Sequence, residues 1–261
     1  MNVAENQMLV DGLRAVELYY RNVREISSGS AAFIQSQTRL NTPDMGVMMP
    51  EAYRELCDYT NQSVALFGLE LVQGLEALGK FEEREVAFHW LSVYMPVNFL
   101  RDEKAEKGIM GYIERYRINS NRICFELPDK LLDETDGAAA ENIKKLRNRG
   151  FHFMLENFGA ATTPMMRLSD FAVDYVLMSA EVTNYLGRDE RADNAVKSMI
   201  SFARDMGAEP IADGVVNAKQ AETLFEFECN YCTGALAGKY MQERYIRRHG
   251  DDDEDTDDKQ E

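Results

Sequence analysis

The sequence is poor in the residues and segments that mark several common classes of protein. Its 261 residues include four cysteines, six prolines and three histidines, and 29 Lys and Arg stand against 45 Asp and Glu. Four cysteines are too few for a disulfide framework, which predicts reduced thiols and a cytoplasmic protein. No apolar run approaches the roughly 20 residues of a membrane span. The N-terminus has no basic segment followed by an apolar one, so no secretion signal is expected.

The excess of negative charge narrows the range of partners. The formal net charge is −16. Because phosphates are bound through Lys and Arg, neither duplex nucleic acid nor an anionic membrane is an expected partner. Residues 250–261 form an acidic tail, whose last eleven residues hold eight acids, one lysine and no apolar side chain. Such a block is typical of a solvated, disordered tail that aids solubility. The alternatives are an arm for a basic partner or a segment that folds back on Arg244, Arg247 and Arg248.

The remaining residues, 1–249, read as one domain in which apolar runs alternate with amphipathic stretches. Hydrophobic residues make up 45% of the sequence, which is enough for a substantial core. Eight runs are predicted strands, at residues 16–23, 31–37, 86–93, 122–127, 151–156, 173–178, 209–212 and 231–233. Helical spacing predicts helices at residues 50–78, 102–116, 135–148, 165–172, 191–206, 218–227 and 238–247.

Alternating strands and helices at this pitch predict an α/β fold. Eight strands in about 235 residues fit a TIM-type (β/α)₈ barrel. The first two strands are separated only by the SSGS turn at residues 27–30. That spacing fits a hairpin and leaves no room for a helical crossover, so the barrel is expected to begin with an antiparallel strand.

Common catalytic and metal-binding motifs are missing. The sequence contains no GxxxxGK[ST], GxGxxG after a strand, HExxH or GxSxG. Its histidines, His89, His152 and His249, are far apart. Cys229 and Cys232 form a CxxC pair without a second pair or a nearby histidine, so two buried thiols are favoured over a zinc site.

Six segments in order resemble the EAL domain family of cyclic di-GMP phosphodiesterases. The segment MLENFG (154–159) resembles the family's DDFG region, and IADGVVNAKQAETL (211–224) resembles VAEGVETxxQxxxL. The other segments are FIQSQTRLNTPDMG (33–46), LSVYMPVNFLRD (91–102), ICFELPD (123–129) and CNYCTG (229–234). The resemblance implies a modified TIM barrel and a homodimer. In the family, carboxylates and an Asn at the strand ends hold two divalent cations, Mg²⁺ or Mn²⁺, that clamp the phosphodiester.

Most of the residues that carry this chemistry are changed here. The metal-binding Glu of the EAL signature falls on Gln35, and the metal-binding Asn falls on Tyr94. The two acids of DDFG become Glu156 and Asn157, and the pocket Lys falls on Leu177. Ligand charge is therefore lost at several positions.

Three acids remain at the positions of metal ligands. Glu126 is identical to the family residue, whereas Glu156 and Asp213 keep a carboxylate at a changed length. Asp129 falls on the acid that steadies a mobile loop. Hard oxygen ligands govern Mg²⁺ and Mn²⁺ binding. No metal is therefore expected, with Glu126, Glu156 and Asp213 as the residual candidates.

The resemblance leaves three functional hypotheses. The first is a catalytically inactive regulatory or protein-binding module with an unknown protein partner. The second is a non-hydrolysing cyclic di-GMP receptor, which rests on Arg39 at the position of a phosphate-contacting Arg. The third is a weak phosphodiesterase that uses Mg²⁺ or Mn²⁺ at the three remaining acids. We favour the first, since an acidic mouth without metal repels a dianion.

Overall fold

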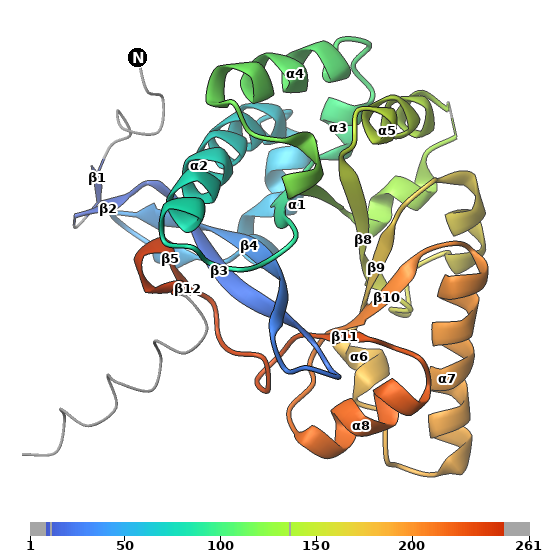
Figure 1. The fold of residues 1–261 in the computed structure, drawn as a ribbon. Coiled ribbons are helices and arrows are strands. Elements are labelled where there is room, and N and C mark those ends of the chain that lie inside the picture. Colours follow the sequence, from blue (N-terminus) through green and yellow to red (C-terminus); the bar gives the residue numbers. More distant parts are fainter. Residues whose placement is uncertain (1–8, 11, 136, 248–261) are drawn as a thin grey trace, which may run out of the picture.

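The computed structural model describes residues 9–247 apart from residues 11 and 136. Its centre is a closed barrel of eight strands, ringed by helices (Figure 1). The strands are β3 (Val16–Glu25), β4 (Ala31–Thr42), β6 (Leu91–Tyr94), β7 (Ile123–Leu127), β8 (His152–Phe158), β9 (Tyr175–Met178), β10 (Glu209–Ala212) and β11 (Tyr231–Cys232). This confirms the predicted α/β barrel.

The barrel closes through its first strand. β3 pairs antiparallel with β4 on one side and with β11 on the other, whereas β4 and β6 to β11 pair in parallel. The turn between β3 and β4 contains Gly29 at a φ of 70°, in the left-handed region that glycine tolerates. The predicted antiparallel first strand is therefore confirmed.

Helices follow most of the parallel strands and cover the outside of the barrel. They are α1 (Pro50–Tyr59), α2 (Ser63–Glu83), α3 (Val97–Leu100), α4 (Ala105–Tyr116), α5 (Ala138–Asn148), α6 (Ala180–Thr183), α7 (Glu190–Asp205) and α8 (Ala218–Glu226). The longest, α2, buries Leu71, Leu78 and Phe81 completely against the barrel. None of the helices in the described ranges is long and apolar enough to cross a membrane.

Several predicted elements differ from the structure. The helix expected at residues 50–78 is two helices, because the chain turns at Asn61, whose φ is 58°. The stretch 165–172 is the 3₁₀ helix η3 (Met165–Asp170). The strand expected from residue 86 begins only at Leu91. The helix expected at 238–247 is instead β12 (Met241–Gln242), paired with β3, followed by the 3₁₀ helix η4 (Glu243–Tyr245).

The remaining elements are short. They are β1 (Leu9–Val10), β2 (Leu13–Arg14), β5 (Gly46–Met48) and the 3₁₀ helices η1 (Ser120–Arg122) and η2 (Asp129–Asp133). The acidic tail and Arg248 lie outside the described residues.

One end of the barrel is filled by aromatic side chains. Phe33, near the start of β4, stacks on Trp90 with ring centroids 4.0 Å apart, and Tyr175 and Tyr231 lie edge-on or tilted against Phe33. Cys229 and Cys232 are free and buried, as the buried-thiol interpretation predicts, and burial raises the pKa of Cys229 to about 12. A ligand site is expected at the opposite end, where the parallel strands terminate, since barrels of this type carry their sites there.

Candidate functional site

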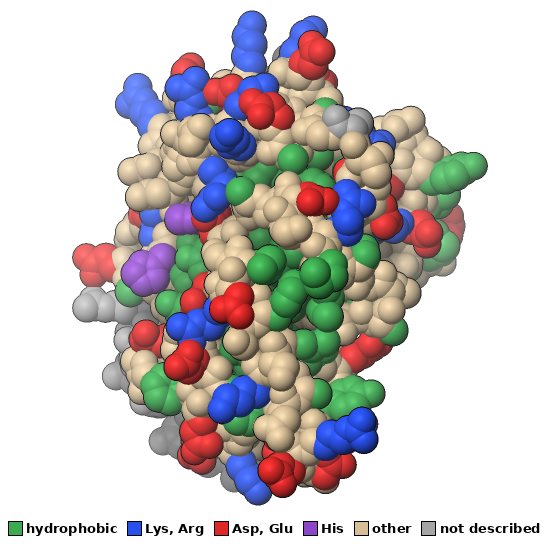
Figure 2. Space-filling model, turned by 90° about the vertical axis from the view of Figure 1, so that its right-hand side faces the viewer, with side chains coloured by type: hydrophobic (Ala, Val, Ile, Leu, Met, Phe, Trp, Pro, Cys, Tyr) green, Lys and Arg blue, Asp and Glu red, His purple; other side chains and the backbone are tan. Residues whose placement is uncertain are grey.

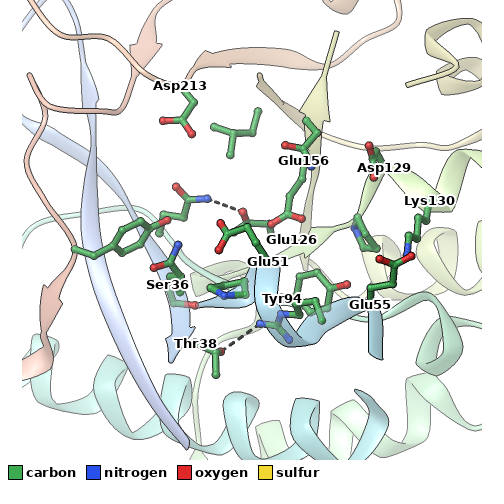
Figure 3. A pocket seen from close by; sticks show the side chains of 18 of the residues that line it. Ser36, Thr38, Glu51, Glu55, Tyr94, Glu126, Asp129, Lys130, Glu156 and Asp213 are labelled. Carbon is green, nitrogen blue, oxygen red and sulfur yellow. Dashed lines mark hydrogen bonds and ion pairs between the residues drawn. The ribbon is translucent and has the colours of Figure 1, made fainter. Parts of the chain in front are cut away.

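A cavity of about 470 Å³ opens at the carboxyl ends of the strands. Residues from α1 and from all eight barrel strands or the loops that follow them line it, including the predicted site residues Gln35, Tyr94, Glu126, Asp129, Glu156, Asn157, Leu177 and Asp213. Figure 3 shows Glu126 and Glu156, on β7 and β8, and Asp213, just after β10, around one space. The structure therefore brings the predicted remnant site together.

Glu126, on β7, has both carboxylate oxygens engaged within the chain. Its Oε1 accepts a hydrogen bond from Gln35 Nε2 at 2.5 Å, and its Oε2 accepts one from Ser92 Oγ at 2.8 Å. The side chain is nearly buried, with 3% of the residue exposed. Two donors satisfy a buried carboxylate that would otherwise be costly to desolvate.

Glu156, on β8, points toward Glu126 (Figure 3). Burial raises the pKa of Glu156 well above its usual range, and the charge of Glu126 and a hydrogen bond with Glu126 act in the same direction. Two carboxyl groups this close cannot both ionise readily. Glu156 therefore retains its proton at pH values where an isolated glutamate has lost its own.

Arg21, on β3, lies between Gln35 and Asp213. Its Nε donates to Gln35 Oε1 at 2.9 Å, its Nη2 forms an ion pair with Asp213 Oδ2 at 3.1 Å, and its guanidinium lies 4.6 Å from the ring centroid of Tyr240. Burial acts to lower the pKa of Arg21, but Tyr240, Asp213 and Glu126 outweigh it and the pKa is raised. A permanent cation therefore lies among the acids. The sequence analysis did not single out Arg21.

Tyr94, at the end of β6, packs against a second arginine. The guanidinium of Arg54, on α1, lies 3.8 Å from the Tyr94 ring centroid and pairs with fully buried Glu70 at 2.8 Å. Burial raises the pKa of the Tyr94 phenol, and the charge of Glu156 adds to the effect. A neutral phenol stacked on a cation is a poor ligand for a hard metal ion. The sequence analysis missed Arg54 too. The only local signal that could have pointed to Arg54 is the neighbouring aromatic residue Tyr53, which is buried.

The remaining predicted residues contribute less to the cavity. Asn157 is exposed, at a φ of 54°, and Leu177 packs with the apolar side chains inside the barrel. Arg39 is not among the residues that line the cavity. Its guanidinium lies 3.7 Å from the Tyr19 ring centroid, and its buried Nε has no hydrogen-bond partner. The predicted phosphate contact at Arg39 therefore has no support in the cavity's geometry.

Comparison with known proteins places this barrel in a family. The EAL domain family model matches residues 6–240. The chain belongs to the EAL domain family. Over 94% of its length it is 21% identical to the cyclic di-GMP phosphodiesterase RocR of Pseudomonas aeruginosa. This EAL domain spans 64% of RocR and smaller shares of the next two curated relatives.

Solved EAL domains have the same fold. The EAL domain protein of Listeria monocytogenes superposes with a TM-score of 0.77 at 16% identity, covering 89% of this chain and 91% of that one. The FimX EAL domain of Pseudomonas aeruginosa, solved with c-di-GMP bound, gives a TM-score of 0.72 at 15% identity, covering 87% and 91%. The recognition of an EAL fold from the six sequence segments is therefore confirmed.

The donor set of this EAL domain does not fit the two-metal centre that its family resemblance implies. Glu126 already accepts two hydrogen bonds, burial and the charge of Glu126 raise the pKa of Glu156, and Asp213 is paired with Arg21. Metal ligands need free lone pairs and deprotonated carboxylates. Within the described residues, no group of three or more His, Cys, Asp or Glu is arranged to hold a metal ion.

Proposed function

We propose that this EAL domain does not hydrolyse cyclic di-GMP and acts as a regulatory or protein-binding module in, or derived from, cyclic di-GMP signalling. The observation that carries the proposal is the set of bonds among the site's own residues. Asp213 pairs with Arg21, Arg21 with Gln35, and Gln35 with Glu126.

Hydrolysis by a two-metal centre needs negatively charged ligands that are available to cations. The metals clamp both oxygens of the in-line displacement and lower the pKa of the attacking water. Here a neutral amide, Gln35, and a neutral phenol, Tyr94, stand at two of the family's ligand positions. The remaining acids bind other side chains, so the residues lack the free anionic oxygens that this chemistry requires.

The charge of the cavity also favours a protein-binding role over a nucleotide-binding one. Seven carboxyl side chains line it, from Glu51, Glu55, Asp58, Glu126, Asp129, Glu156 and Asp213, against the three cations of Arg21, Arg54 and Lys130. Without metal ions, an acidic surface repels a dinucleotide that carries two phosphate charges.

Apolar surface elsewhere fits the same role. On the side of the barrel that carries α7, hydrophobic side chains gather in the middle of the face among charges of both signs (Figure 2). Contiguous exposed apolar surface marks interaction sites. The proposal includes a homodimer, a further protein partner and a cytoplasmic location, and light scattering of the purified protein tests the dimer.

A non-hydrolysing cyclic di-GMP receptor is the second candidate. The open cavity of about 470 Å³ favours it, as do the EAL structures of PaMucR and FimX, which were solved with c-di-GMP bound. Calorimetry with cyclic di-GMP, with and without Mg²⁺, separates the two candidates. We expect no heat of binding in either condition, whereas saturable heat would favour the receptor.

A hydrolysis assay at high protein concentration, with Mg²⁺ or Mn²⁺, tests the main proposal. The matched control is Glu126→Ala, which removes the retained acid. We expect the protein and the variant to give the same background rate. Turnover in the unmodified protein that is lost in Glu126→Ala would instead establish a residual phosphodiesterase that uses Glu126, Glu156 and Asp213.

A further inference from the structure

The outer face of α1 presents apolar side chains to solvent. Met49 at the N-cap of the helix, Ala52, Leu56 and Tyr59 follow one another at intervals of three, four and three residues. Side chains with this spacing lie on one face of a helix. Leu56 and Tyr59 are 64% and 88% exposed, and Met49 and Ala52 are exposed as well. We call these four residues the α1 seam.

The α1 seam lies where exposed apolar side chains concentrate. Among the described residues, six of the thirteen large hydrophobic side chains that are exposed fall between residues 45 and 64. Only Met49 separates β5 from α1, so the exposed Val47 of β5 is a neighbour of the seam. Single exposed hydrophobic residues are normal, whereas a contiguous group of them marks an interaction site.

The spacing of the seam fits a helix as its occupant. Alternating intervals of three and four residues are the a and d positions of a heptad, whose side chains insert between those of a facing helix. The opposite face of α1 already holds the helix to the barrel. Tyr53 is buried there, and its hydroxyl donates a hydrogen bond to the carbonyl of Thr38 at 3.0 Å. The seam is therefore the face that α1 leaves for another molecule.

The charge beside the seam is negative. Glu51, Glu55 and Asp58 are the acids of α1, and their spacing of four and three residues places them along one side of the helix, where they line the cavity mouth. Lys130 lies 3.8 Å from Glu55, but both side chains are exposed, and such a pair contributes little. Arg54, the one cation of α1, is bound to a buried carboxylate of α2.

We propose that the α1 seam binds an amphipathic helix of a partner protein, in which lysine or arginine flanks the apolar face. The proposal rests on the proposed function, since it gives the protein-binding module a docking surface and its partner a chemistry. A second copy of this chain is disfavoured as the occupant, because it would add its own row of acids to the interface. The same repulsion argues against the acidic residues 250–261 of this chain.

Fluorescence anisotropy with two synthetic helical peptides and the full chain tests the proposal. Both peptides have three heptads with leucine at every a and d position. One has lysine and the other glutamate at every e and g position, so like charges oppose pairing of either peptide with itself. We expect the protein to bind the lysine peptide at least about tenfold more tightly than the glutamate peptide. No binding of the lysine peptide would overturn the proposal.

Removal of the apolar side chains tests the seam itself. The double variant Leu56→Asn, Tyr59→Asn is expected to bind the lysine peptide at least about tenfold more weakly than the unmodified protein. The matched control is Phe225→Asn, which removes an apolar side chain that is 46% exposed on α8 and should leave the affinity unchanged. Equal affinity in the double variant and the unmodified protein would overturn the proposal, because the net negative charge alone would then attract the peptide.

Charge reversal beside the seam separates local charge from net charge. Glu55→Lys is expected to weaken the lysine peptide and to strengthen the glutamate peptide, each by at least about threefold. The matched control is Glu141→Lys on α5, whose native side chain is 58% exposed and whose substitution changes the net charge equally. Equal effects of the two substitutions would contradict the proposal. This comparison carries the test if the asparagine variant fails to fold.

The oligomeric state separates the occupants, and hydrolysis separates the two proposals. A dimer of the unmodified protein that light scattering no longer finds in the asparagine variant would show that a second copy occupies the seam, and the basic partner would be wrong. Hydrolysis of cyclic di-GMP contradicts the proposed function whatever the peptides give. Failure of the lysine peptide in a protein without hydrolysis contradicts the docking surface alone.

Discussion

At the scale of single residues, the cavity depends on buried charged pairs whose partners lie on different elements. Arg54 and Glu70 are one such pair, with side chains 15% and 0% exposed. Arg54→Met leaves Glu70 buried without its cation, which costs about 3 kcal/mol of unfolding free energy. Urea denaturation measures this loss. Lys145→Met, which removes one partner of an exposed pair 4.0 Å apart, is the control and is expected to cost less than about 0.5 kcal/mol.

The double variant Arg54→Met, Glu70→Met completes this test. It removes both charges, so most of the lost stability is expected to return. A loss below about 1 kcal/mol in Arg54→Met, or no recovery in the double variant, would show that the pair does not act as a buried unit.

Glu156 gives the protein a pH dependence of its own. Burial is the largest cause that raises the pKa of Glu156 in the folded state, and the charge of Glu126 is the next. In the unfolded state its pKa is about 4.3. The folded state therefore holds the proton more tightly. This contribution to stability is fully present below about pH 4.3 and is lost as the pH rises through the folded pKa.

Glu156→Gln removes this proton equilibrium and keeps the shape of the side chain. Melting temperatures between pH 5 and pH 9 are expected to fall more steeply in the unmodified protein than in the variant. The exposed Glu141→Gln, whose native side chain is 58% exposed, is the matched control and should follow the unmodified protein. Parallel profiles for all three proteins would show that Glu156 titrates normally.

The predicted acids were found together in the cavity, but the cation between them was not predicted. Arg24 pairs with Ala31 next to the turn, and if that register continued along the two strands, Arg21 would lie opposite Ile34. A register shift between Val23 and Arg24 places Arg21 opposite Gln35 instead. A β-bulge inserts one residue and re-aims side chains in this way. The sequence carried no signal for the bulge, so the Arg21–Gln35 contact could not be derived from it.

At the scale of elements, α2 lies so close to β6 that only glycine fits between them at one position. A Cβ on Gly74 would lie 2.8 Å from Cγ2 of Val93. Gly74→Ala is therefore expected to cost about 1–3 kcal/mol through overpacking. Gly79, on the same helix, has nothing within 4 Å of such a Cβ. Gly79→Ala should instead stabilise the protein by about 0.5–1 kcal/mol, because alanine favours helix more than glycine.

Chemical denaturation of both glycine variants decides between packing and helix propensity. Val93→Ala combined with Gly74→Ala should recover part of the loss, since the clashing methyl is gone. Equal effects of the two glycine substitutions would mean that α2 does not depend on close approach at Gly74.

Elements with a repeated apolar pattern were predicted well, and those decided by one backbone angle were not. The apolar rhythm of residues 50–78 continues across Asn61, where a left-handed φ of 58° ends one helix before the next begins. Residues 238–247 form a strand and a 3₁₀ turn because Met241 and Gln242 pair with Tyr20 and Tyr19 of β3. Such tertiary pairing overrides local helical spacing.

At the scale of the whole molecule, the barrel was predictable because many weak signals agree. Eight strands, their order and the short turn before β4 all point to one topology, and the family resemblance adds six segments in sequence. The chemistry of the site depends on single side chains, so agreement among many weak signals predicts the fold but not the site. The same fold can therefore be retained while Gln35, Tyr94 and Arg21 change what its mouth can bind.

The boundary between the barrel and its acidic tail allows a prediction for the whole chain. Residues after 249 carry no apolar side chain to bury, so a chain that ends at residue 249 should melt within about 1 °C of the full chain. A chain that ends at Tyr240 is the contrast, because it loses β12, the ion pair of Glu243 with Lys80 at 2.6 Å and Ile246, which is 4% exposed.

Burial of one isoleucine side chain contributes about 1.5–3 kcal/mol, and each kcal/mol shifts the melting temperature of a domain this size by about 2–4 °C. The chain that ends at Tyr240 should therefore melt at least about 5 °C lower, because β3 keeps its pairing with β4 at Tyr19 and Tyr20 but loses its pairing with β12 on the other edge. Scanning calorimetry of the three chains measures both shifts. If removing residues 250–261 alone lowers the melting temperature by as much, the tail contributes to the fold, and the basic side chains Arg244 and Arg247 become its expected partners.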